Sequence, residues 1–224
     1  ALPISYCPER FNPGDPAHGV RQVARVIGCS NPEIGAGLVG LYSRLTTEDV
    51  RYVGKLEVAE ASKVIENVQR DINIALVNEL ARIFPVMGVD VEDVLTAAAT
   101  KWNFHRYTPG VGVGGHCIPV DPYYMIQRAA DVGVPAELIT AARAVNRTMP
   151  IHVAGVLNEI LYKAGVPSGE GKVLLLGWSY KAEVGDPRET PAEPLCEALQ
   201  SKDISVAAYD PHLNPEDFPE GVEV

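Results

Sequence analysis

A cysteine directly after a run of glycines is the most unusual chemical feature of this 224-residue sequence. The stretch TPGVGVGGHCIPVDP covers residues 108–122, and its alternating glycines allow the backbone to approach a ligand and to present N–H groups to anionic oxygens. Cys117 follows them, and Asp121 could orient a water or exchange a proton at an adduct of the thiol. The alternative is a glycine-rich turn around an inert, buried cysteine. The neighbouring residues favour nucleophilic chemistry at Cys117.

Other candidate side chains lie nearer the N-terminus. Lys63 and Asn67 are four residues apart in a predicted helix and share one face, with Glu60 three residues before Lys63. On helix spacing alone, a solvated stripe of Glu and Lys is the simpler interpretation. Glu9 follows a predicted strand and lies between Pro8 and Arg10, where a carboxylate is either a surface residue or a base. The sequence does not choose between these alternatives.

A third group follows the apolar run KVLLLG. Lys181 and Arg188 flank Asp186 shortly after this predicted strand. They therefore lie at the carboxyl end of a parallel strand, where open α/β sheets bind ligands. Cations at such a position suit an anionic nucleotide.

Two stretches match the dinucleotide pattern GxGxxG, namely residues 35–40 (GAGLVG) and 110–115 (GVGVGG). The pattern holds a pyrophosphate only when the glycines join a strand to the N-terminus of a helix. The residues CSNPEI separate the first match from its strand, and the second precedes HCIP rather than a helix start. Neither match locates a cofactor.

Composition excludes several classes of protein. The 29 acidic residues outnumber the 19 lysines and arginines, which gives a formal net charge of −10, and no basic stripe is present, so nucleic acid is not an expected partner. No apolar run is long enough to cross a bilayer, and the first residues lack a signal-peptide pattern, so we expect no membrane partner. The four cysteines lie far apart, which argues against a zinc ribbon or a disulfide scaffold and favours a reducing cytoplasm.

Periodicity predicts an α/β chain with a helical centre. Short strands are predicted at 4–6, 23–27 and 50–53, among turns, and a long amphipathic helix at 56–86 that Pro85 and Gly88 end. Asp90 and Asp93 begin a short helix through 94–99, and prolines begin three more helices, at 122–131, 135–146 and 150–164. A strand at KVLLLG, a helix at 192–200 and a strand at 204–209 follow. Because the sheets at both ends lack strands, we expect the chain to be a fragment.

Four motifs in this order resemble the UDP-glucose/GDP-mannose dehydrogenase family of nucleotide-sugar 6-dehydrogenases. They are YCPERFNPGD, AEASKVIENVQRDINIALVNE, PGVGVGGHCIPVDPYY and LLLGWSYKAEVGDPRETP, and the resemblance covers nearly the whole chain. It implies that 1–54 is the end of an N-terminal NAD-binding Rossmann domain, 55–168 the central helical dimerisation domain and 169–224 the start of a Rossmann-like UDP-sugar domain. It also implies NAD as cofactor, with the main NAD site outside this chain, so residues 1–224 alone are expected to bind no NAD and to be inactive.

The resemblance also assigns roles to individual residues. Cys117 matches the nucleophile that forms a thiohemiacetal and then a thioester during a four-electron oxidation of a C6 alcohol. Lys63 and Asn67 match the pair that stabilises the oxyanion, Asp121 an acid or base acting through water, and Glu9 a carboxylate linked to thioester hydrolysis. Arg188 matches an arginine that closes over the cofactor. The expected UDP-sugar contacts are Lys181, Tyr107, Gly112, Gly114 and Gly115, with Arg106 as a further local cation.

His116 and Val120 favour one branch of the family. Serine and lysine usually occupy these positions in the UDP-glucose and GDP-mannose enzymes, whereas GGHCIPVDP resembles the UDP-N-acetylhexosamine branch. We therefore expect a UDP-N-acetylhexosamine substrate, with N-acetylmannosamine first, and a homodimer formed through the long helix. The alternatives are a UDP-glucose 6-dehydrogenase and a non-catalytic module that dimerises or binds UDP-sugars.

Overall fold

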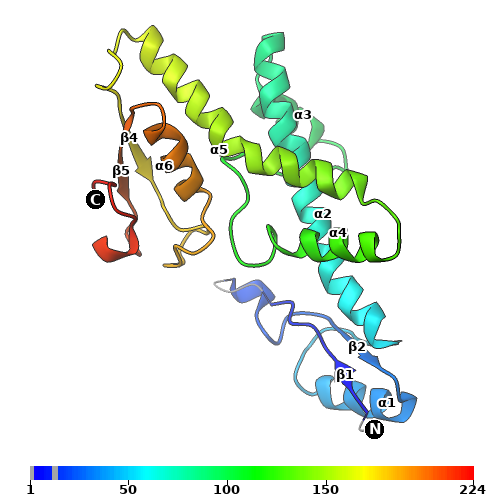
Figure 1. Ribbon diagram of the computed structural model, residues 1–224. Coiled ribbons are helices and arrows are strands. Elements are labelled where there is room, and N and C mark those ends of the chain that lie inside the picture. The colour runs from blue at the N-terminus through cyan, green and yellow to red at the C-terminus, as the bar shows by residue number, and fades with distance from the viewer. Residues whose placement is uncertain (1–2, 12–14) are drawn as a thin grey trace. The chain divides into compact units, whose positions relative to one another are not determined.

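The computed structural model describes residues 3–11 and 15–224, and the chain divides into two compact units, Ala1–Asn67 and Val68–Val224 (Figure 1). Helix α2 (Leu56–Ile83) contains the boundary between them. Among the described residues, no helix combines the length and apolarity that crossing a membrane requires. The predicted fold class, an α/β chain with long central helices and small sheets, is confirmed.

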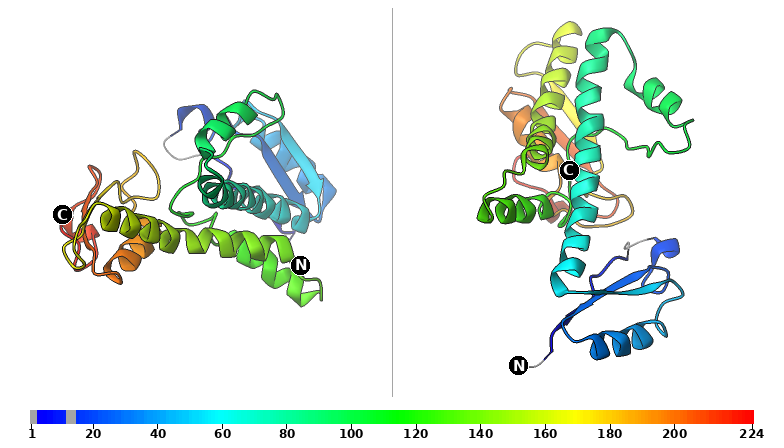
Figure 2. Two further views of the ribbon diagram at one scale, coloured as in Figure 1. Left: turned by 90° about the horizontal axis from the view of Figure 1, so that it is seen from above. Right: turned by 90° about the vertical axis from the view of Figure 1, so that its right-hand side faces the viewer.

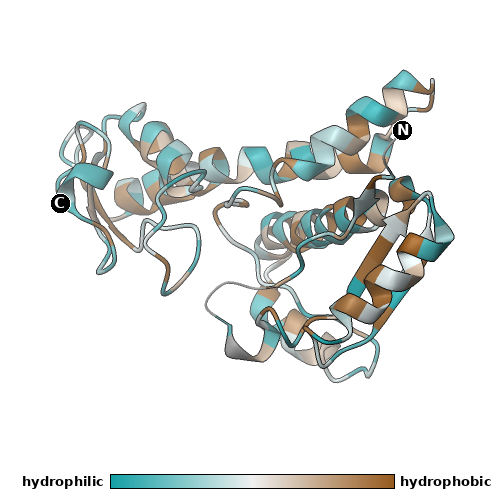
Figure 3. Cartoon of the chain, turned by 90° about the horizontal axis from the view of Figure 1, so that it is seen from below, coloured by the Kyte–Doolittle hydropathy of each residue, from teal (hydrophilic) through white to brown (hydrophobic). Residues whose placement is uncertain are grey.

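The first unit contains a three-stranded sheet in the order β1-β2-β3, formed by β1 (Ser5–Tyr6), β2 (Arg25–Cys29) and β3 (Val50–Gly54). β1 pairs antiparallel with β2, and β2 pairs parallel with β3. Helix α1 (Pro32–Tyr42) covers one face of the sheet, and apolar residues run along the strands (Figures 2 and 3). A short 3-10 helix η1 (Pro16–His18) precedes β2. The sheet holds the segment around Glu9 at the end of β1.

Helix α1 corrects the prediction that residues 1–53 form only strands and turns. Its first residue is Pro32, and the side chain of Asn31 accepts hydrogen bonds from the N–H groups of Glu33 and Ile34. These are ordinary signals for the start of a helix. The three glycines of GAGLVG have low helix propensity, and for that reason no helix was predicted here. Packing of the helix on the sheet outweighs the free-energy cost of the glycines. A side chain at Gly35 would collide with the Tyr52 ring, whose atoms lie 2.4 Å from an ideal Cβ.

The second unit begins with the rest of α2 and continues through three further helices before its sheet. A 3-10 turn η2 (Phe84–Met87) ends α2 at Gly88, which has a φ of 72°, as the predicted stop requires. Asp90 caps α3 (Val91–Ala98), and α4 (Asp121–Asp131) and α5 (Glu137–Lys163) follow. β4 (Lys172–Leu176), α6 (Ala192–Gln200) and β5 (Ser205–Tyr209) then form a parallel βαβ unit, followed by a 3-10 turn η3 (Pro215–Asp217). Its apolar core packs α6 against the strands and α5.

Helix α5 corrects a second prediction, because it is one helix where proline signals suggested two. Pro150 lies inside it and removes one backbone hydrogen bond, that with the C=O of Asn146. The side chains of Met149, Pro150 and Ala154 are buried on the same helix. Burial on both sides of the proline therefore holds the two halves in one helix.

A buried polar network joins α2, α5 and the start of the glycine-rich loop. Arg143 Nη1 lies 2.6 Å from Asp71 Oδ1, and Asn146 Nδ2 donates to the same oxygen at 2.8 Å. Asn78 Nδ2 donates to Asn146 Oδ1 at 2.9 Å, and Asn78 Oδ1 accepts the N–H of Gly110 at 2.9 Å. Burial raises the pKa of the Asp71 carboxyl, while the Arg143 charge and the hydrogen bonds from Arg143 and Asn146 oppose that shift. The network fixes the helices and the first residue of the loop together.

Breaking this network from one side should destabilise the protein strongly. Asp71→Leu leaves the Arg143 guanidinium buried without its carboxylate, so we expect a loss of about 3–5 kcal/mol in the free energy of unfolding. The double variant Asp71→Leu/Arg143→Met removes both charges and should recover much of that loss. Urea unfolding of the parent and the two variants measures the difference. A double variant no more stable than Asp71→Leu alone would contradict the role of the pair.

Candidate functional site

The candidate nucleophile lies on an exposed turn that leads into α4. Cys117 is exposed, and its carbonyl accepts hydrogen bonds from the N–H groups of Val120 at 3.1 Å and Asp121 at 2.8 Å. Asp121 is the first residue of α4. This turn joins the backbones of Cys117 and Asp121 at the start of α4. An exposed thiol also removes the alternative of a buried, inert cysteine.

The glycines before Cys117 are needed because another part of the chain lies against them. An ideal Cβ at Gly114 would lie 2.7 Å from Pro191 Cδ and 2.7 Å from Tyr180 Cβ, and one at Gly115 would lie 3.0 Å from the Tyr180 ring. Gly115 has a φ of 92° and donates its N–H to the carbonyl of Glu189 at 3.0 Å. Gly112 has a φ of 139°. The loop is therefore docked on the segment 180–191, and the N–H of Gly115 is already hydrogen-bonded.

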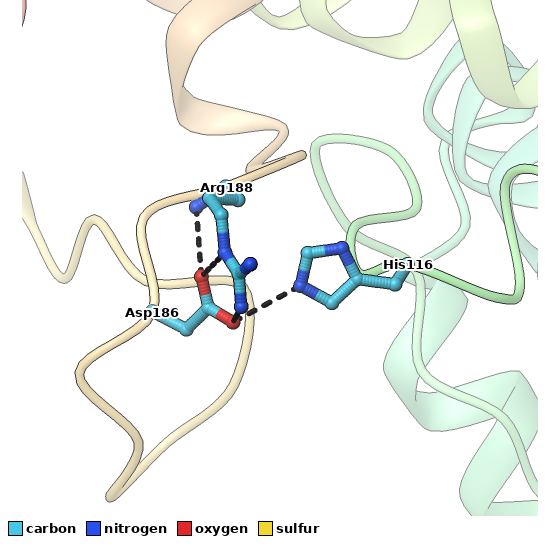
Figure 4. A network of polar contacts seen from close by, with 3 residues as sticks. All are labelled: His116, Asp186 and Arg188. Atoms are coloured by element: carbon cyan, nitrogen blue, oxygen red, sulfur yellow. Dashed lines mark hydrogen bonds and ion pairs between the residues drawn. The ribbon is translucent and has the colours of Figure 1, made fainter.

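The residues after β4 form a polar cluster beside this loop (Figure 4). Asp186 accepts hydrogen bonds from Arg188 and from His116, which precedes Cys117. Hydrogen bonds from Arg188 and then from His116 hold the pKa of the Asp186 carboxyl well below its usual range. The Arg188 side chain is 72% exposed, and Lys181 is half-buried in the same segment. The predicted cations thus do lie at the carboxyl end of β4.

Asp210, which sequence reasoning missed, anchors this segment. It follows β5, and its carboxylate accepts the N–H groups of Trp178 and Ser179, both at 2.9 Å. Burial raises the pKa of Asp210, but hydrogen bonds from the Ser179, His212 and Trp178 backbones outweigh burial and lower it to about 2. A carboxylate at the end of a parallel strand was the available signal. Asp210 fixes where the chain leaves β4.

Tyr107 and Arg106 lie on the chain between α3 and the glycines. Tyr107 is half-buried and lines a cavity of about 370 Å³ against α2, with Gln69 and Asn73. Arg106 forms an ion pair with Glu92 of α3 and lies 3.4 Å from the Thr96 hydroxyl. Arg106 therefore has a carboxylate partner already, which the sequence did not indicate.

A second cavity, of about 400 Å³, is lined in part by the glycine loop. Its lining includes Gly112 from the loop, Arg143 and Arg147 from α5, and Glu189 and Glu193 beside and in α6. None of these four charged residues was predicted from the sequence to belong to the site. The basic residues of α5 stand four apart and so share one face, which was the only available signal.

The remaining predicted residues belong to the first unit. Lys63 is half-buried and Asn67 buried, one turn apart on one face of α2. Glu9 is exposed, and the next residue, Arg10, pairs with Glu66 of α2 at 2.6 Å and donates to the carbonyl of Ala24 at 3.1 Å. The structure therefore ties the Glu9 segment to the turn of α2 that carries the predicted oxyanion pair.

Neither glycine pattern has the context of a dinucleotide site. Residues 35–40 lie inside α1, and residues 110–115 lie in the loop between α3 and α4. Arg188 is the predicted cofactor contact in this chain. In the part of the chain that the structure describes, neither glycine pattern forms a turn between a strand and the start of a helix, where a pyrophosphate could bind. Across the same residues, no group of three or more His, Cys, Asp or Glu side chains could hold a metal ion.

Known protein families match both the part of the chain that contains Cys117 and the part that contains Asp186 and Arg188. Residues 57–148 match the central domain of the UDP-glucose/GDP-mannose dehydrogenase family, and residues 174–223 match that family's UDP binding domain. A UDP-N-acetyl-D-glucosamine 6-dehydrogenase of Pseudomonas aeruginosa is 43% identical over 212 residues, which are 95% of this chain and 50% of that protein. A UDP-N-acetyl-D-mannosamine dehydrogenase of Methanococcus vannielii is 35% identical over 94% of this chain and 48% of its own length.

A solved structure shows the same arrangement of elements. The UDP-D-ManNAc dehydrogenase of Pyrococcus horikoshii superposes with a TM-score of 0.87 at 33% identity, over 95% of this chain and 50% of that one. The chain thus spans about half the length of the curated relatives it matches.

The docked glycines yield a prediction with a matched control. Gly114→Ala should lower the free energy of unfolding by about 1–3 kcal/mol, because the new methyl group overlaps Pro191 and Tyr180. Gly110→Ala places a methyl group where no atom lies within 4 Å and keeps the N–H that Asn78 binds, so it should change stability little. Thermal unfolding compares the two. Equal losses in both variants would show that glycine flexibility, and not docking, sets the requirement.

Proposed function

Because this chain belongs to the UDP-glucose/GDP-mannose dehydrogenase family, we propose that the protein containing it oxidises the C6 alcohol of a UDP-N-acetylhexosamine to a carboxylate. The observation that carries the proposal is the exposed Cys117 beside Asp121, on a loop docked to the UDP-binding segment. NAD supplies the oxidant in this proposal by accepting a hydride in each of two steps. The described residues contain little of an NAD site, so the contribution of this chain is to bind the sugar and to carry the covalent intermediate.

Cys117 captures the aldehyde between the two oxidations. Its thiolate sulfur adds to the C6 carbon, and the carbonyl oxygen becomes the oxyanion of a thiohemiacetal. After the second oxidation the sulfur is joined to C6 as a thioester, and water adds to that carbon and releases the acid and the thiol. Asp121, at the start of α4 beside Cys117, is the proposed acid or base that acts through water.

Two residues of α2 and one that follows β1 are also assigned roles in the proposed chemistry. Lys63 and Asn67 present a cation and an amide from one helix face, as stabilising an oxyanion requires. Glu9 is the proposed carboxylate for thioester hydrolysis, and its segment is tied to α2 by the Arg10–Glu66 ion pair. These three assignments rest on the family resemblance, and those of Lys63 and Asn67 also on the helix face that they share.

The residues proposed to contact the substrate and NAD differ in exposure and in the partners that they already have. Lys181 and Tyr107 are half-buried, and glycines 112, 114 and 115, which lie between Tyr107 and Cys117 in the sequence, pack against Pro191 or Tyr180. Arg106 can reach a diphosphate only by leaving Glu92, an exchange that costs little because exposed ion pairs contribute about 0–1 kcal/mol. Arg188 is the proposed NAD contact, and its exposed guanidinium is oriented by Asp186.

The identity of the sugar is proposed from two observations that favour different sugars. His116 and Val120 resemble the N-acetylhexosamine branch, for which N-acetylmannosamine was the first expectation from the sequence. The 43% identity to a UDP-N-acetyl-D-glucosamine 6-dehydrogenase exceeds the 35% identity to a UDP-N-acetyl-D-mannosamine dehydrogenase. We therefore propose UDP-N-acetylglucosamine as the first substrate to assay and UDP-N-acetylmannosamine as the second.

The domain limits 1–54, 55–168 and 169–224, the cytoplasmic location and the homodimer are proposals as well. Apolar side chains exposed on α2 and α5 support a second copy as the partner, since burying them stabilises an assembly. They are Ile65, Leu76, Ile83, Leu138, Ile151 and Ile160.

Replacing the nucleophile should separate binding from turnover. In the whole protein that contains this chain, Cys117→Ser should lower kcat for complete oxidation by about a hundredfold or more, because serine is a far weaker nucleophile at neutral pH. The Kd for the UDP-sugar, measured by calorimetry, should stay within about threefold of the parent value. Cys7→Ser, at a half-buried cysteine outside the proposed chemistry, is the control. Oxidation to the acid by Cys117→Ser at the parent rate would sink the assignment and favour a module that only binds.

Parallel assays should identify the sugar. We expect kcat/KM for UDP-N-acetylglucosamine or UDP-N-acetylmannosamine to exceed that for UDP-glucose by at least about tenfold, since a pocket that hydrogen-bonds the acetamido group is left unpaired by glucose. NADH formation with each UDP-sugar measures the ratio. Preference for UDP-glucose would remove the branch assignment while leaving the dehydrogenase proposal in place.

A further inference from the structure

One carboxylate joins the loop that precedes Cys117 to Arg188. Asp186 Oδ2 lies 3.0 Å from His116 Nε2 and 2.8 Å from Arg188 Nη2. Its other oxygen accepts from Arg188 Nε at 2.8 Å and from the Arg188 backbone N–H at 3.1 Å. Figure 4 shows the contacts of this carboxylate with the guanidinium and with the imidazole. The Asp186 side chain is 16% exposed, whereas that of Arg188 is 72% exposed.

Backbone and ring contacts hold the same two segments together. The N–H of Gly115 donates to the Glu189 carbonyl, and the His116 and Tyr180 rings meet edge to face with centroids 5.9 Å apart. Residues 114–116 are therefore held on the segment 180–191 by sterics, by the backbone and by a charged side chain. Cys117 is the next residue in the chain, so its position depends on these contacts.

The protonation states follow from the geometry. Because its pKa is held well below the usual range by Arg188 and then by His116, the Asp186 carboxyl is ionised and only accepts hydrogen bonds. His116 must then carry a proton on Nε2, and this contact fixes the orientation of its ring. Low exposure keeps water from screening the carboxylate as it screens a surface pair.

We infer that Asp186 is a positioning residue that fixes the backbone beside Cys117 through His116 and orients Arg188 through its two guanidinium contacts. The inference rests on the proposed function, in which Cys117 attacks the substrate and Arg188 contacts NAD. One side chain therefore sets both the nucleophile and the cofactor contact. Asp186 is not among the proposed UDP-sugar contacts, and the glycines that are among them keep their contacts with Tyr180, Pro191 and the Glu189 carbonyl when Asp186 is replaced.

Steady-state kinetics of the whole protein that contains this chain test the two arms of this carboxylate separately. Asp186→Asn keeps the shape but loses the charge, so we expect kcat to fall and KM for NAD to rise, each by about tenfold, since hydrogen bonds to charged groups are worth about that much. KM for the UDP-sugar should stay within about twofold. His116→Leu should lower kcat and leave KM for NAD unchanged, because Arg188 keeps its partner. His116→Gln retains an N–H donor and should restore most of kcat.

Two controls exclude a general loss of structure or charge. Glu159→Gln removes a carboxylate from the exposed Glu159–Lys163 pair of α5 and should change neither kcat nor KM. In the double variant Asp186→Asn/His116→Leu, kcat should be no lower than in the worse single variant, because His116 acts through Asp186. Losses that multiply in the double variant, or an Asp186→Asn variant that matches Glu159→Gln, would overturn the inference.

Hydrogen exchange tests the positioning role without any turnover. Asp186→Asn should raise the amide exchange rates of peptides covering 113–120 and 186–188 at least about threefold above those of the parent, because one hydrogen-bonded contact with a charged group is lost. Glu159→Gln should leave these rates unchanged. Unchanged exchange in Asp186→Asn would overturn the inference. If the protein oxidises no UDP-sugar but the exchange differs as expected, the proposed function fails and the positioning link stands.

Discussion

The close packing of Gly114 and Gly115 against Tyr180 and Pro191 is the constraint on which the candidate site depends. A side chain at either glycine would collide with the segment that follows β4, so this approach of two backbones requires glycine. The approach brings the Glu189 carbonyl to the N–H of Gly115 and Asp186 to His116. Cys117 then follows at the exposed end of a loop whose preceding residues cannot move independently of the UDP-binding segment.

The same loop is anchored at its other end by the buried polar network. Asn78 holds the N–H of Gly110, and Asn78 in turn is bound to Asn146, which shares Asp71 with Arg143. A buried ion pair contributes little net stability, but its hydrogen bonds specify one geometry for the helices that carry it. The glycine loop thus runs between two fixed points, one set by α2 and α5 and the other by the segment after β4.

The chain carries a net charge of −10, so its net charge does not attract an anionic nucleotide. The proposed binding therefore depends on individual cationic side chains near the site. The basic side chains near the site pair with carboxylates that differ in exposure. Arg143 pairs with the buried Asp71, Arg188 with the mostly buried Asp186 and Arg106 with the exposed Glu92. Water screens the exposed pair most, so Arg106 is the cation that an incoming phosphate can recruit at least cost.

The sequence by itself determined the long helix α2, the cap at Asp90, the individual strands and helix of the βαβ unit and the spacing of Cys117 and Asp121, because each follows from a pattern within a few neighbouring residues. It also carried the family resemblance, which lies in short motifs. Helix α1 and the continuous α5 were decided by tertiary packing, since burial against the sheet and around Pro150 outweighs unfavourable local propensity. The role of the glycines, the pairing of Arg106 and the bridge made by Asp186 were likewise decided only in three dimensions. Each joins residues whose partners are set by long-range packing, which no local pattern records.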